Sequence, residues 1–413
     1  MIDPKDIPLT LDDMKGSVRL LVFASLFFTA LLPAAPMGPE ASPAQPSAFR
    51  ERLQPLVNDR TIAGAVALVA NRDRILGVEA VGYADLSKGA ELRVDDLFWI
   101  ASMTKPIAAA AVLMLQDEGK LNVTDPVENH LPEFKDLWLL QQEDSKERKL
   151  VRPERPITIR DLMTHTSGMG DPAPPSPHST LAEAVMFYSQ QPLRFQPGSR
   201  WQYSTAGIDV LGRIVEVVSG KACADFYTDR IFVPLGMKNT TFWPNARQAA
   251  HVAKSYKPGQ SSGLEETDIF LVKGSLSDRR RTPRPGGGLF STAHDVARFY
   301  QMMLNGGTLA GKRILSSESV AELTRTQTGD IRTGFTAGMS WGLGFQVVKE
   351  PQGVTAMLSP GTFGHGGAYG TQSWADPKRD LIYVLMIQRA GFANGDESPV
   401  RKIFQETVAA GCH

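Results

Sequence analysis

Two serines in this chain stand in patterns that could support nucleophilic chemistry. Ser102 lies in "ASMTKP", where Lys105 follows three positions later. Ser340 lies in "GMSWG", which fits the G-x-S-x-G pattern of a serine held on a sharp turn between a strand and a helix. The residues around each serine show which of the two has the local structure that this chemistry needs.

The sequence around Ser340 does not meet the structural requirement of its pattern. The residues after it, "WGLGFQVVKE", combine glycines with β-branched side chains and predict a strand rather than a helix. The preceding "DIRTGFTAG" is polar and interrupted by glycine, which makes a poor buried strand. We therefore interpret Ser340 as a structural residue.

Ser102 has a more suitable context. The apolar residues after it follow a helical stripe that ends near Gly119, and residues three apart on a helix share one face. Lys105 would then lie beside Ser102 and could act as its base if burial lowered the lysine pKa. The N–H groups at the start of a helix could also stabilise a developing oxyanion. The alternative is an ordinary helix start with a surface lysine, because S-x-x-K alone occurs often by chance.

Two further stretches could complete such a site. In "PGSRWQYSTAG", Tyr203 stands just before a predicted helix, and a phenol near a Ser–Lys pair can pass a proton to a leaving group. In "FGHGGAYGTQSW", glycines crowd the start of a strand, where they allow a ligand to approach the backbone closely. The alternatives are a half-buried tyrosine without a catalytic role and a simple bulge or loop.

The predicted elements place strands at both ends of the chain. A hairpin is predicted from Ile62 around the turn "ANRDR", and another near the C-terminus around "DPKRD". A helix capped by Thr292 precedes the C-terminal strands, and "PVRKIFQETVAA" predicts a closing helix. This order predicts an α+β fold in which N- and C-terminal strands form one antiparallel sheet flanked by helices, with a mostly helical insertion at about residues 120–290.

These motifs, in this order and spacing, resemble those of the penicillin-recognising serine hydrolases. The resemblance is strongest to class C β-lactamases, family VIII carboxylesterases and related D-aminopeptidases. It covers residues 50–408 approximately, and it implies the β-lactamase/transpeptidase-like fold. Supporting phrases are "ITIRDLMTHTSGM", "PGSRWQYSTAG", "GGGLFSTAHDVARFYQMMLNGG" and "FGHGGAYGTQSWADPKRD".

The resemblance implies a role for each motif residue. Ser102 would be the acylated nucleophile, and Lys105 and Tyr203 would share general-base and general-acid work. The backbone N–H groups of Ser102 and Ala368 would form the oxyanion hole. No metal or cofactor is implied, and the expected partner is a small ester or amide substrate.

Two substrate-binding positions depart from the family pattern. Thr205 replaces the Asn of Y-x-N, which would contact the acyl side chain of the substrate or Lys105. His365, followed by Gly366 and Gly367, replaces the Lys of K-T-G, which helps to hold a substrate carboxylate. A histidine with a reference pKa near ~6.5 is mostly neutral at pH 7, so the fixed charge is missing.

These departures favour a carboxylesterase acting on short-chain esters. A β-lactamase, D,D-peptidase or D-aminopeptidase acting on amide bonds remains the first alternative. A non-catalytic penicillin-binding-like sensor on the same fold is the second, although retention of Ser102, Lys105 and Tyr203 argues against it.

Composition and motifs give no support to nucleic-acid binding, a disulfide framework, a metal site or a phosphate loop. The 413 residues contain 44 basic and 44 acidic side chains, so a net charge of zero gives no support to a nucleic-acid partner. Two cysteines and seven histidines show no disulfide framework and no metal-ligand spacing. "PGGGLF" lacks the G-K-[ST] of a phosphate loop, "DRRRTPR" is interpreted as a solvated loop, and His165 is interpreted as a structural residue of a helix-ending turn.

The N-terminus indicates export. An apolar run from Leu20 to Leu32 has the length of a signal-peptide core and is too short for a bilayer span. Translation from Met14 would place Lys15 and Arg19 directly before that run. We expect a signal peptide and linker over residues 1–48, a hydrolase domain over 49–408, a tail over 409–413, and a periplasmic or secreted protein. No stable membrane span would remain after signal removal; an uncleaved anchor is the alternative.

Overall fold

An eight-stranded sheet forms the centre of the fold in a computed structural model, which describes residues 46–143, 147–260 and 263–411. The strand order is β12-β13-β14-β15-β16-β1-β2-β3, and every neighbouring pair is antiparallel. The predicted α+β fold is therefore confirmed, because strand β16 near the C-terminus pairs directly with β1 near the N-terminus. The strands are β1 (Gly64–Ala70), β2 (Ile75–Asp85), β3 (Ala90–Glu91), β12 (Met339–Trp341), β13 (Gln346–Val348), β14 (Phe363–Gly366), β15 (Gln372–Asp376) and β16 (Leu381–Met386).

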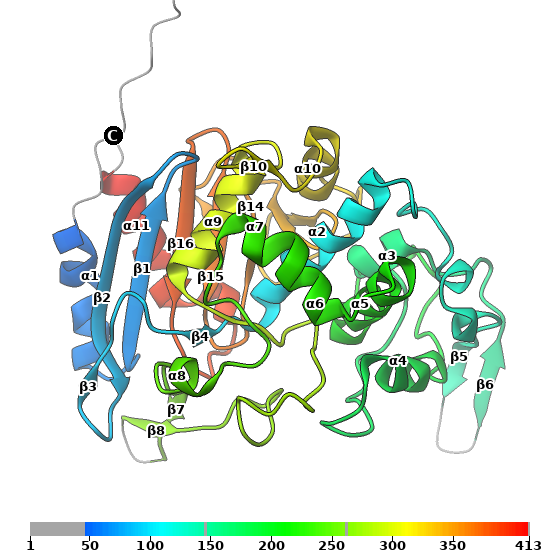
Figure 1. The fold of residues 1–413 in the computed structure, drawn as a ribbon, viewed down its shortest axis with the longest axis horizontal. Coiled ribbons are helices and arrows are strands. Elements are labelled where there is room, and N and C mark those ends of the chain that lie inside the picture. Colours follow the sequence, from blue (N-terminus) through cyan, green and yellow to red (C-terminus); the bar gives the residue numbers. More distant parts are fainter. Residues whose placement is uncertain (1–45, 144–146, 261–262, 412–413) are drawn as a thin grey trace, which may run out of the picture. The chain divides into compact units, whose positions relative to one another are not determined.

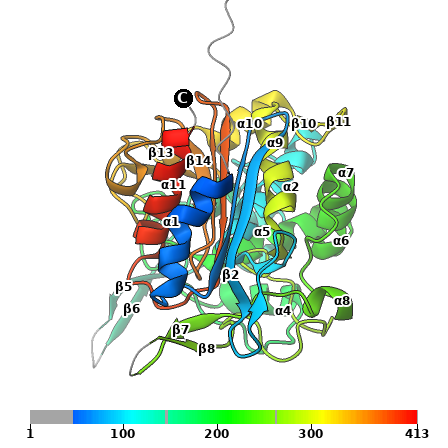
Figure 2. The same ribbon diagram turned by 90° about the vertical axis from the view of Figure 1, so that its left-hand side faces the viewer.

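Helices cover both faces of this sheet, and β1 shows why. Val66 and Leu68 point into the core shared with α2 (Thr104–Asp117) and α9 (Ala293–Leu304). The alternate residues Ala65, Ala67 and Val69 point into a second core with α1 (Pro46–Asn58) and α11 (Pro399–Gly411). Figure 2 shows α1 and α11 side by side over this second face. A strand buried on both faces is apolar at every position, as the sequence of β1 is.

Most remaining helices lie between the two groups of strands in the sequence. Figure 1 shows α3 to α6 gathered beside α2, on the side away from β1 and β2. These and the other helices of this part of the chain are α3 (Ile159–Met163), α4 (Leu181–Ser189), α5 (Thr205–Ser219), α6 (Cys223–Tyr227), α7 (Val233–Leu235), α8 (Ala246–Ala249) and α10 (Ser317–Thr324). Small two-stranded sheets join β4 (Phe98–Trp99) to β9 (Phe290–Ser291), β5 (Leu139–Glu143) to β6 (Arg148–Val151), β7 (Tyr256–Pro258) to β8 (Leu264–Glu266), and β10 (Thr308–Leu309) to β11 (Lys312–Arg313).

The described part of the chain begins and ends in helices. Helix α1 begins at Pro46, and proline is well tolerated in the first turn of a helix. Helix α11 extends to Gly411. The division into residues 1–48, 49–408 and 409–413 stays a prediction. The predicted signal peptide, with Met14 and the run from Leu20 to Leu32, lies outside the described residues. Within the described ranges, no helix combines the length and apolarity that a membrane crossing needs.

Helix α2 is more deeply buried than its sequence pattern predicts. The pattern indicated one apolar stripe, yet every residue from Thr104 to Leu115 is buried. The small side chains of "PIAAAA" allow neighbouring segments to approach from all sides. At Gly344, which has a φ of +75°, an added Cβ would lie 2.5 Å from the Cβ of Ala109. The helix that follows Ser102 is therefore fixed between the sheet and the helical region.

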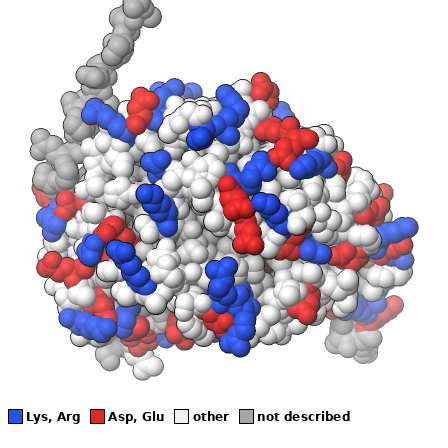
Figure 3. All heavy atoms as spheres, viewed as in Figure 1, with Lys and Arg blue, Asp and Glu red and all other residues white. Residues whose placement is uncertain are grey.

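The charged side chains show no segregation on the face seen in Figure 3. Lysines and arginines lie among aspartates and glutamates across this face. This distribution agrees with the net charge of zero. The absence of a nucleic-acid partner stays a prediction.

Candidate active site

Ser102 lies in a short 3-10 turn, Ala101–Met103, that leads directly into α2. Lys105 is in the first turn of α2, and its Nζ lies 3.1 Å from Ser102 Oγ. The sequence prediction that S-x-x-K brings the two side chains together is therefore confirmed. Ala101 has a φ of +46°, which is unusual for a residue with a Cβ and is a kind of backbone strain found often at functional sites.

Lys105 is completely buried, which has a direct electrostatic consequence. Burial lowers its pKa from 10.5 to about 7, against the opposing attraction of Asp171 and Asp209. The amine also donates a hydrogen bond to the carbonyl of Gly286. At neutral pH a substantial fraction of Lys105 is therefore an uncharged amine beside the hydroxyl of Ser102, and an uncharged amine can accept a proton.

The carbonyl of Gly286 is held in place by a buried ion pair. Asp209 of α5 accepts a hydrogen bond from the N–H of Gly286 at 2.9 Å and from Nε of Arg284 at 2.6 Å. Asp209 is fully buried, and the Arg284 side chain is 9% exposed. Burial raises the pKa of the Asp209 carboxyl, and Arg284 opposes that shift. The "PGGG" segment thus supplies the carbonyl that accepts a hydrogen bond from Lys105.

Tyr203 also lies beside Ser102. It precedes α5, whose N-cap Ser204 accepts a hydrogen bond from the N–H of Gly207 at 3.0 Å. The amine of Lys105 lies 4.6 Å from the centre of the Tyr203 ring. Burial raises the pKa of Tyr203 well above its usual range, while a hydrogen bond with Ser102 acts in the other direction. Tyr203 is therefore a protonated phenol with its hydroxyl at the serine.

His165 packs beside Tyr203 and holds the backbone next to it. Its Nδ1 accepts a hydrogen bond from the N–H of Ser204 at 3.2 Å, and its ring lies 4.5 Å from that of Tyr203. His165 is buried and has a φ of +59°, so its turn must be held firmly. Its predicted structural role is confirmed. Among the described residues, no group of His, Cys, Asp and Glu side chains could hold a metal ion.

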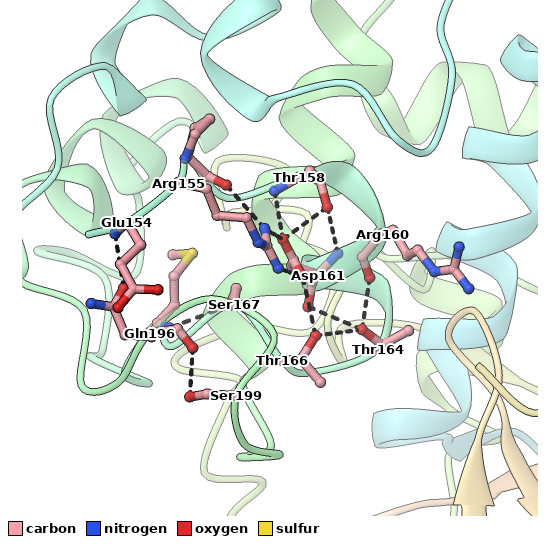
Figure 4. Close-up of polar contacts among 12 residues, drawn as sticks. Glu154, Arg155, Thr158, Arg160, Asp161, Thr164, Thr166, Ser167, Gln196 and Ser199 are labelled. Carbon is pink, nitrogen blue, oxygen red and sulfur yellow. Dashed lines mark hydrogen bonds and ion pairs between the residues drawn. The ribbon is translucent and has the colours of Figure 1, made fainter. Parts of the chain in front are cut away.

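The turn that carries His165 is fixed by the polar cluster of Figure 4. Asp161 caps the start of α3 by accepting from Thr158, and it receives two hydrogen bonds from Arg155 at 2.6 and 2.9 Å. Thr166 also donates to Asp161, at 3.3 Å, and shares a 2.8 Å hydrogen bond with Thr164. The stretch "ITIRDLMTHTSGM" therefore builds a rigid support for His165.

His365 lies on β14 and lines the small cavity with Ser102, as the resemblance to the family implied. Its Nδ1 is 2.6 Å from the carbonyl of Gly366, and its buried Nε2 has no hydrogen-bond partner among the described residues. Burial and the nearby Lys105 lower the pKa of His365 to about 4. The position that holds lysine in the family pattern is therefore uncharged at neutral pH here.

The glycines after His365 are required by close packing of protein atoms. An added Cβ on Gly366 would lie 1.9 Å from Asp396 Oδ1, and one on Gly367 would lie 2.0 Å from Thr371 Oγ1. These positions therefore need glycine to pack against Asp396 and Thr371, in addition to any room that they give a ligand.

Two connected cavities meet at Ser102. We call the first, of about 500 Å³, the large lobe and the second, of about 270 Å³, the small lobe. Ser102, Tyr203 and Ala368 line both lobes. Other residues lining the large lobe include Trp99, Pro172, Pro174, Thr205, Phe270 and Leu271. The remaining residues lining the small lobe are Phe335, His365, Gly366, Gly367, Ala393, Asn394, Gly395 and Asp396.

This arrangement accommodates the two halves of an acyl substrate around one hydroxyl. The N–H of Ala368 donates to no other backbone group in the described part of the chain, so it is available to a ligand. Ser102 lies in the turn that leads into α2, where a backbone N–H could stabilise a developing oxyanion. All predicted site residues are therefore brought together around the junction of the two lobes.

Ser340 is placed elsewhere in the structure. It lies in β12 with 3% exposure, and its Oγ is 3.2 Å from Thr328 Oγ1. A strand follows it, as predicted, and not the helix that a nucleophile turn requires. Its neighbour Trp341 does reach the site, because its ring packs 5.6 Å from that of His365.

Sequence patterns did not predict the residues that support Ser102 and Lys105 or the side chains that line the small lobe. Asp209, Arg284 and Gly286 hold Lys105, and Phe335 and Asp396 line the small lobe. No local pattern distinguishes these residues, because each acts through a contact between segments far apart in the chain. The resemblance of "GGGLFSTAHDVARFY" to the family was the one available signal for the Gly286 region.

The whole folded part matches one family. The family description "Beta-lactamase" fits residues 49–406. The chain belongs to the beta-lactamase family. It is a serine hydrolase, and the resemblance inferred from the motifs is confirmed.

Similar proteins of known sequence or structure cover most of this beta-lactamase-family enzyme. Protein Rv1367c of Mycobacterium tuberculosis is 36% identical over 79% of this chain and 86% of its own length. Esterase EstB of Burkholderia gladioli is 29% identical over 91% of this chain and 99% of its own length. The solved structure of EstCE1, "a hydrolase with promiscuous acyltransferase activity", has a TM-score of 0.72 at 24% identity, covering 88% of this chain and 99% of that one. This last likeness supports the fold.

The support of Lys105 by Gly286 can be tested with two adjacent substitutions. In Gly286→Ala the new Cβ would lie 2.6 Å from both Cγ2 and the carbonyl oxygen of Thr205, so the backbone must move. We expect a loss of about 1–3 kcal/mol in the free energy of unfolding, together with reduced hydrolytic activity. Denaturant titration and ester hydrolysis measure the two effects.

Gly287→Ala is the matched control. Its Cβ would lie 3.1 Å from the flexible end of Leu271 and at ordinary contact distances of 3.7 and 3.8 Å from the backbone of Ala101. This variant should stay within about 1 kcal/mol of the wild type. Equal effects of the two substitutions would contradict the role given to Gly286.

Proposed function

We propose that this enzyme is a carboxylesterase that acts on short-chain esters through a covalent acyl-enzyme at Ser102. The observation that carries the proposal is the buried amine of Lys105, 3.1 Å from Ser102 Oγ, with a pKa of about 7. An amine with such a pKa accepts the serine proton at neutral pH, where an exposed lysine would be fully charged.

The reaction would proceed in two balanced steps. Ser102 Oγ attacks the ester carbonyl and transfers its proton to Lys105, and the N–H groups of Ser102 and Ala368 stabilise the oxyanion. The bond to the alcohol then breaks, and Tyr203 donates its proton to the departing oxygen and regains one from Lys105, which is uncharged again. Water next gives a proton to Lys105 as it attacks the acyl-enzyme. The bond to Ser102 Oγ then breaks, the carboxylic acid leaves, and Lys105 returns the proton to Ser102. No metal or cofactor is required by these steps.

The charge of the small lobe favours esters over β-lactams. Among the described residues that line it, neither lysine nor arginine is present to bind a substrate carboxylate, and the low pKa of His365 keeps that side chain uncharged. The esterase name of the relative EstB points in the same direction. Hydrolysis of D-alanyl peptides is the second candidate, because relatives in Salmonella are named putative D-alanyl-D-alanine carboxypeptidases at 27% identity.

A panel of three substrates separates these candidates. We expect a short-chain nitrophenyl ester to be hydrolysed with a kcat/KM at least about 100-fold above that of a chromogenic cephalosporin or a D-alanyl amide. The reason is that the cephalosporin depends on a group that binds its carboxylate, and the amide has a poorer leaving group than the ester. A higher kcat/KM for either amide substrate would transfer the assignment to the corresponding peptidase or β-lactamase.

The identity of the nucleophile can be tested with the two competing serines. Ser102→Ala should lower ester hydrolysis by at least about 10³-fold, because loss of a nucleophile removes the covalent route. Ser340→Ala should stay within about twofold, because Ser340 is outside both lobes. Mass mapping after reaction with a serine-directed probe should find the label on Ser102, and a label on Ser340 would reject this mechanism.

The pH dependence should report Lys105. Because only the uncharged amine accepts a proton, kcat/KM for an uncharged ester should rise with pH and level off above about 7. The residual activity of Lys105→Met should lack that step. A midpoint near 4 in the wild type would instead indicate titration of His365.

A further inference from the structure

The small lobe contains a carboxylate that no step of the proposed reaction uses. Asp396 lies in the 3-10 turn Gly395–Glu397 and is 8% exposed. Its two oxygens accept hydrogen bonds from the amides of Gln372 at 3.0 Å and Gln346 at 3.1 Å. Both glutamines are completely buried, so the carboxylate is held in one orientation. It also lies directly against the backbone of Gly366, next to His365.

No cation in the described part of the chain forms an ion pair with this carboxylate. Arg401 is the nearby positive charge, but its Nη1 donates to the main-chain carbonyl of Asp396 at 2.7 Å, and its guanidinium stacks 4.3 Å from the centre of the Trp374 ring. Arg401 is fully buried and does not line the lobe. Among the described lining residues, Asp396 is therefore the one Asp, Glu, Lys or Arg side chain.

An aromatic ring completes the small lobe. Phe335 is 41% exposed even though its ring lies 5.0 Å from that of Tyr203 and 5.6 Å from that of Trp201. Its carbonyl accepts a hydrogen bond at 2.7 Å from Asn394, which in turn accepts from the N–H of Asp396 at 3.0 Å. The aromatic ring and the carboxylate are thus tied to the same segment and line one cavity.

A carboxylate together with an aromatic face is a combination that attracts organic cations. A cation close to the face of an aromatic ring is attracted by the ring, and the attraction is stronger where water is excluded. The negative charge adds an attraction that is stronger in a partly buried cavity than in water. A carboxylate on the ligand would be repelled by the same charge.

We propose that the small lobe receives the alcohol part of the ester and selects alcohols that carry an ammonium group. This inference rests on the proposed esterase function. Because both lobes are lined by Ser102, an ester with its carbonyl carbon at Ser102 Oγ can place its acyl part in one lobe and its alcohol part in the other. The large lobe, with the apolar side chains of Trp99 and Leu271, suits the acyl chain, which leaves the small lobe for the alcohol part. The volume of about 270 Å³ suits a small amino alcohol.

Two esters of equal shape test the charge preference. The butyrate ester of choline carries a quaternary nitrogen where the butyrate ester of 3,3-dimethylbutanol carries an uncharged carbon. We expect the wild-type kcat/KM to be about tenfold or more higher for the choline ester. The butyrate ester of glycolic acid, with a carboxylate in the alcohol part, should be the poorest substrate of the three.

Two acidic neighbours provide a matched pair of variants. Asp396→Asn should bring the ratio of kcat/KM for the choline and dimethylbutyl esters close to one. Glu397→Gln removes the same charge from the next residue, which is exposed and does not line the lobe, and should keep the wild-type ratio. An equal loss of preference in both variants would show a general field effect and overturn the specific role of Asp396.

The wild-type protein supplies a test that does not depend on folding of a variant. Choline should inhibit hydrolysis of the dimethylbutyl ester more strongly than 3,3-dimethylbutanol does. Equal inhibition, together with equal cleavage of the two esters, would overturn the charge preference and leave the esterase function standing. Failure to cleave any of the esters would instead reject the proposed function, and this inference with it.

Discussion

The chemistry of this enzyme depends on the burial of one amine. Complete burial lowers the pKa of Lys105 from 10.5 to about 7, which corresponds to about 5 kcal/mol of disfavoured charge. The fold tolerates such a cost only because the amine has fixed acceptors, the carbonyl of Gly286 and the hydroxyl of Ser102. The carbonyl of Gly286 depends in turn on the buried pair of Asp209 and Arg284. The same packing that stabilises the fold around Lys105 therefore also keeps its pKa low.

The sheet and the helical region meet where this amine lies. Ser102 precedes the central helix α2, His365 lies on β14, and Tyr203 precedes α5. Each is held by its own secondary element, so their relative positions are set by packing between layers. The rings of His165 and Trp341 pack against each other, and they contact Tyr203 and His365 respectively. Phe335 and Asp396 line the small lobe, where the proposed selection of substrates would take place.

Local sequence patterns predicted the elements well where one physical signal dominated. The hairpin around "ANRDR", the N-cap of Thr292 and the turn before β16 each follow from side chains close in sequence. The pattern failed for α2, because a helix surrounded by protein has no polar face to reveal its orientation. It predicted the closing helix α11 almost to its last residue, but it gave no signal for α1.

The sequence by itself determined which serine lies beside a lysine at a helix start and which serine leads into a strand. Ser102 and Lys105 are three residues apart at a helix start, and that spacing alone brings them together. Ser340 leads into a strand, and its own neighbours reveal this. Only the tertiary structure decided the protonation of Lys105, the uncharged state of His365 and the charge of the small lobe. Burial and electrostatic fields are properties of groups that meet in space from distant parts of the chain, so no local pattern encodes them.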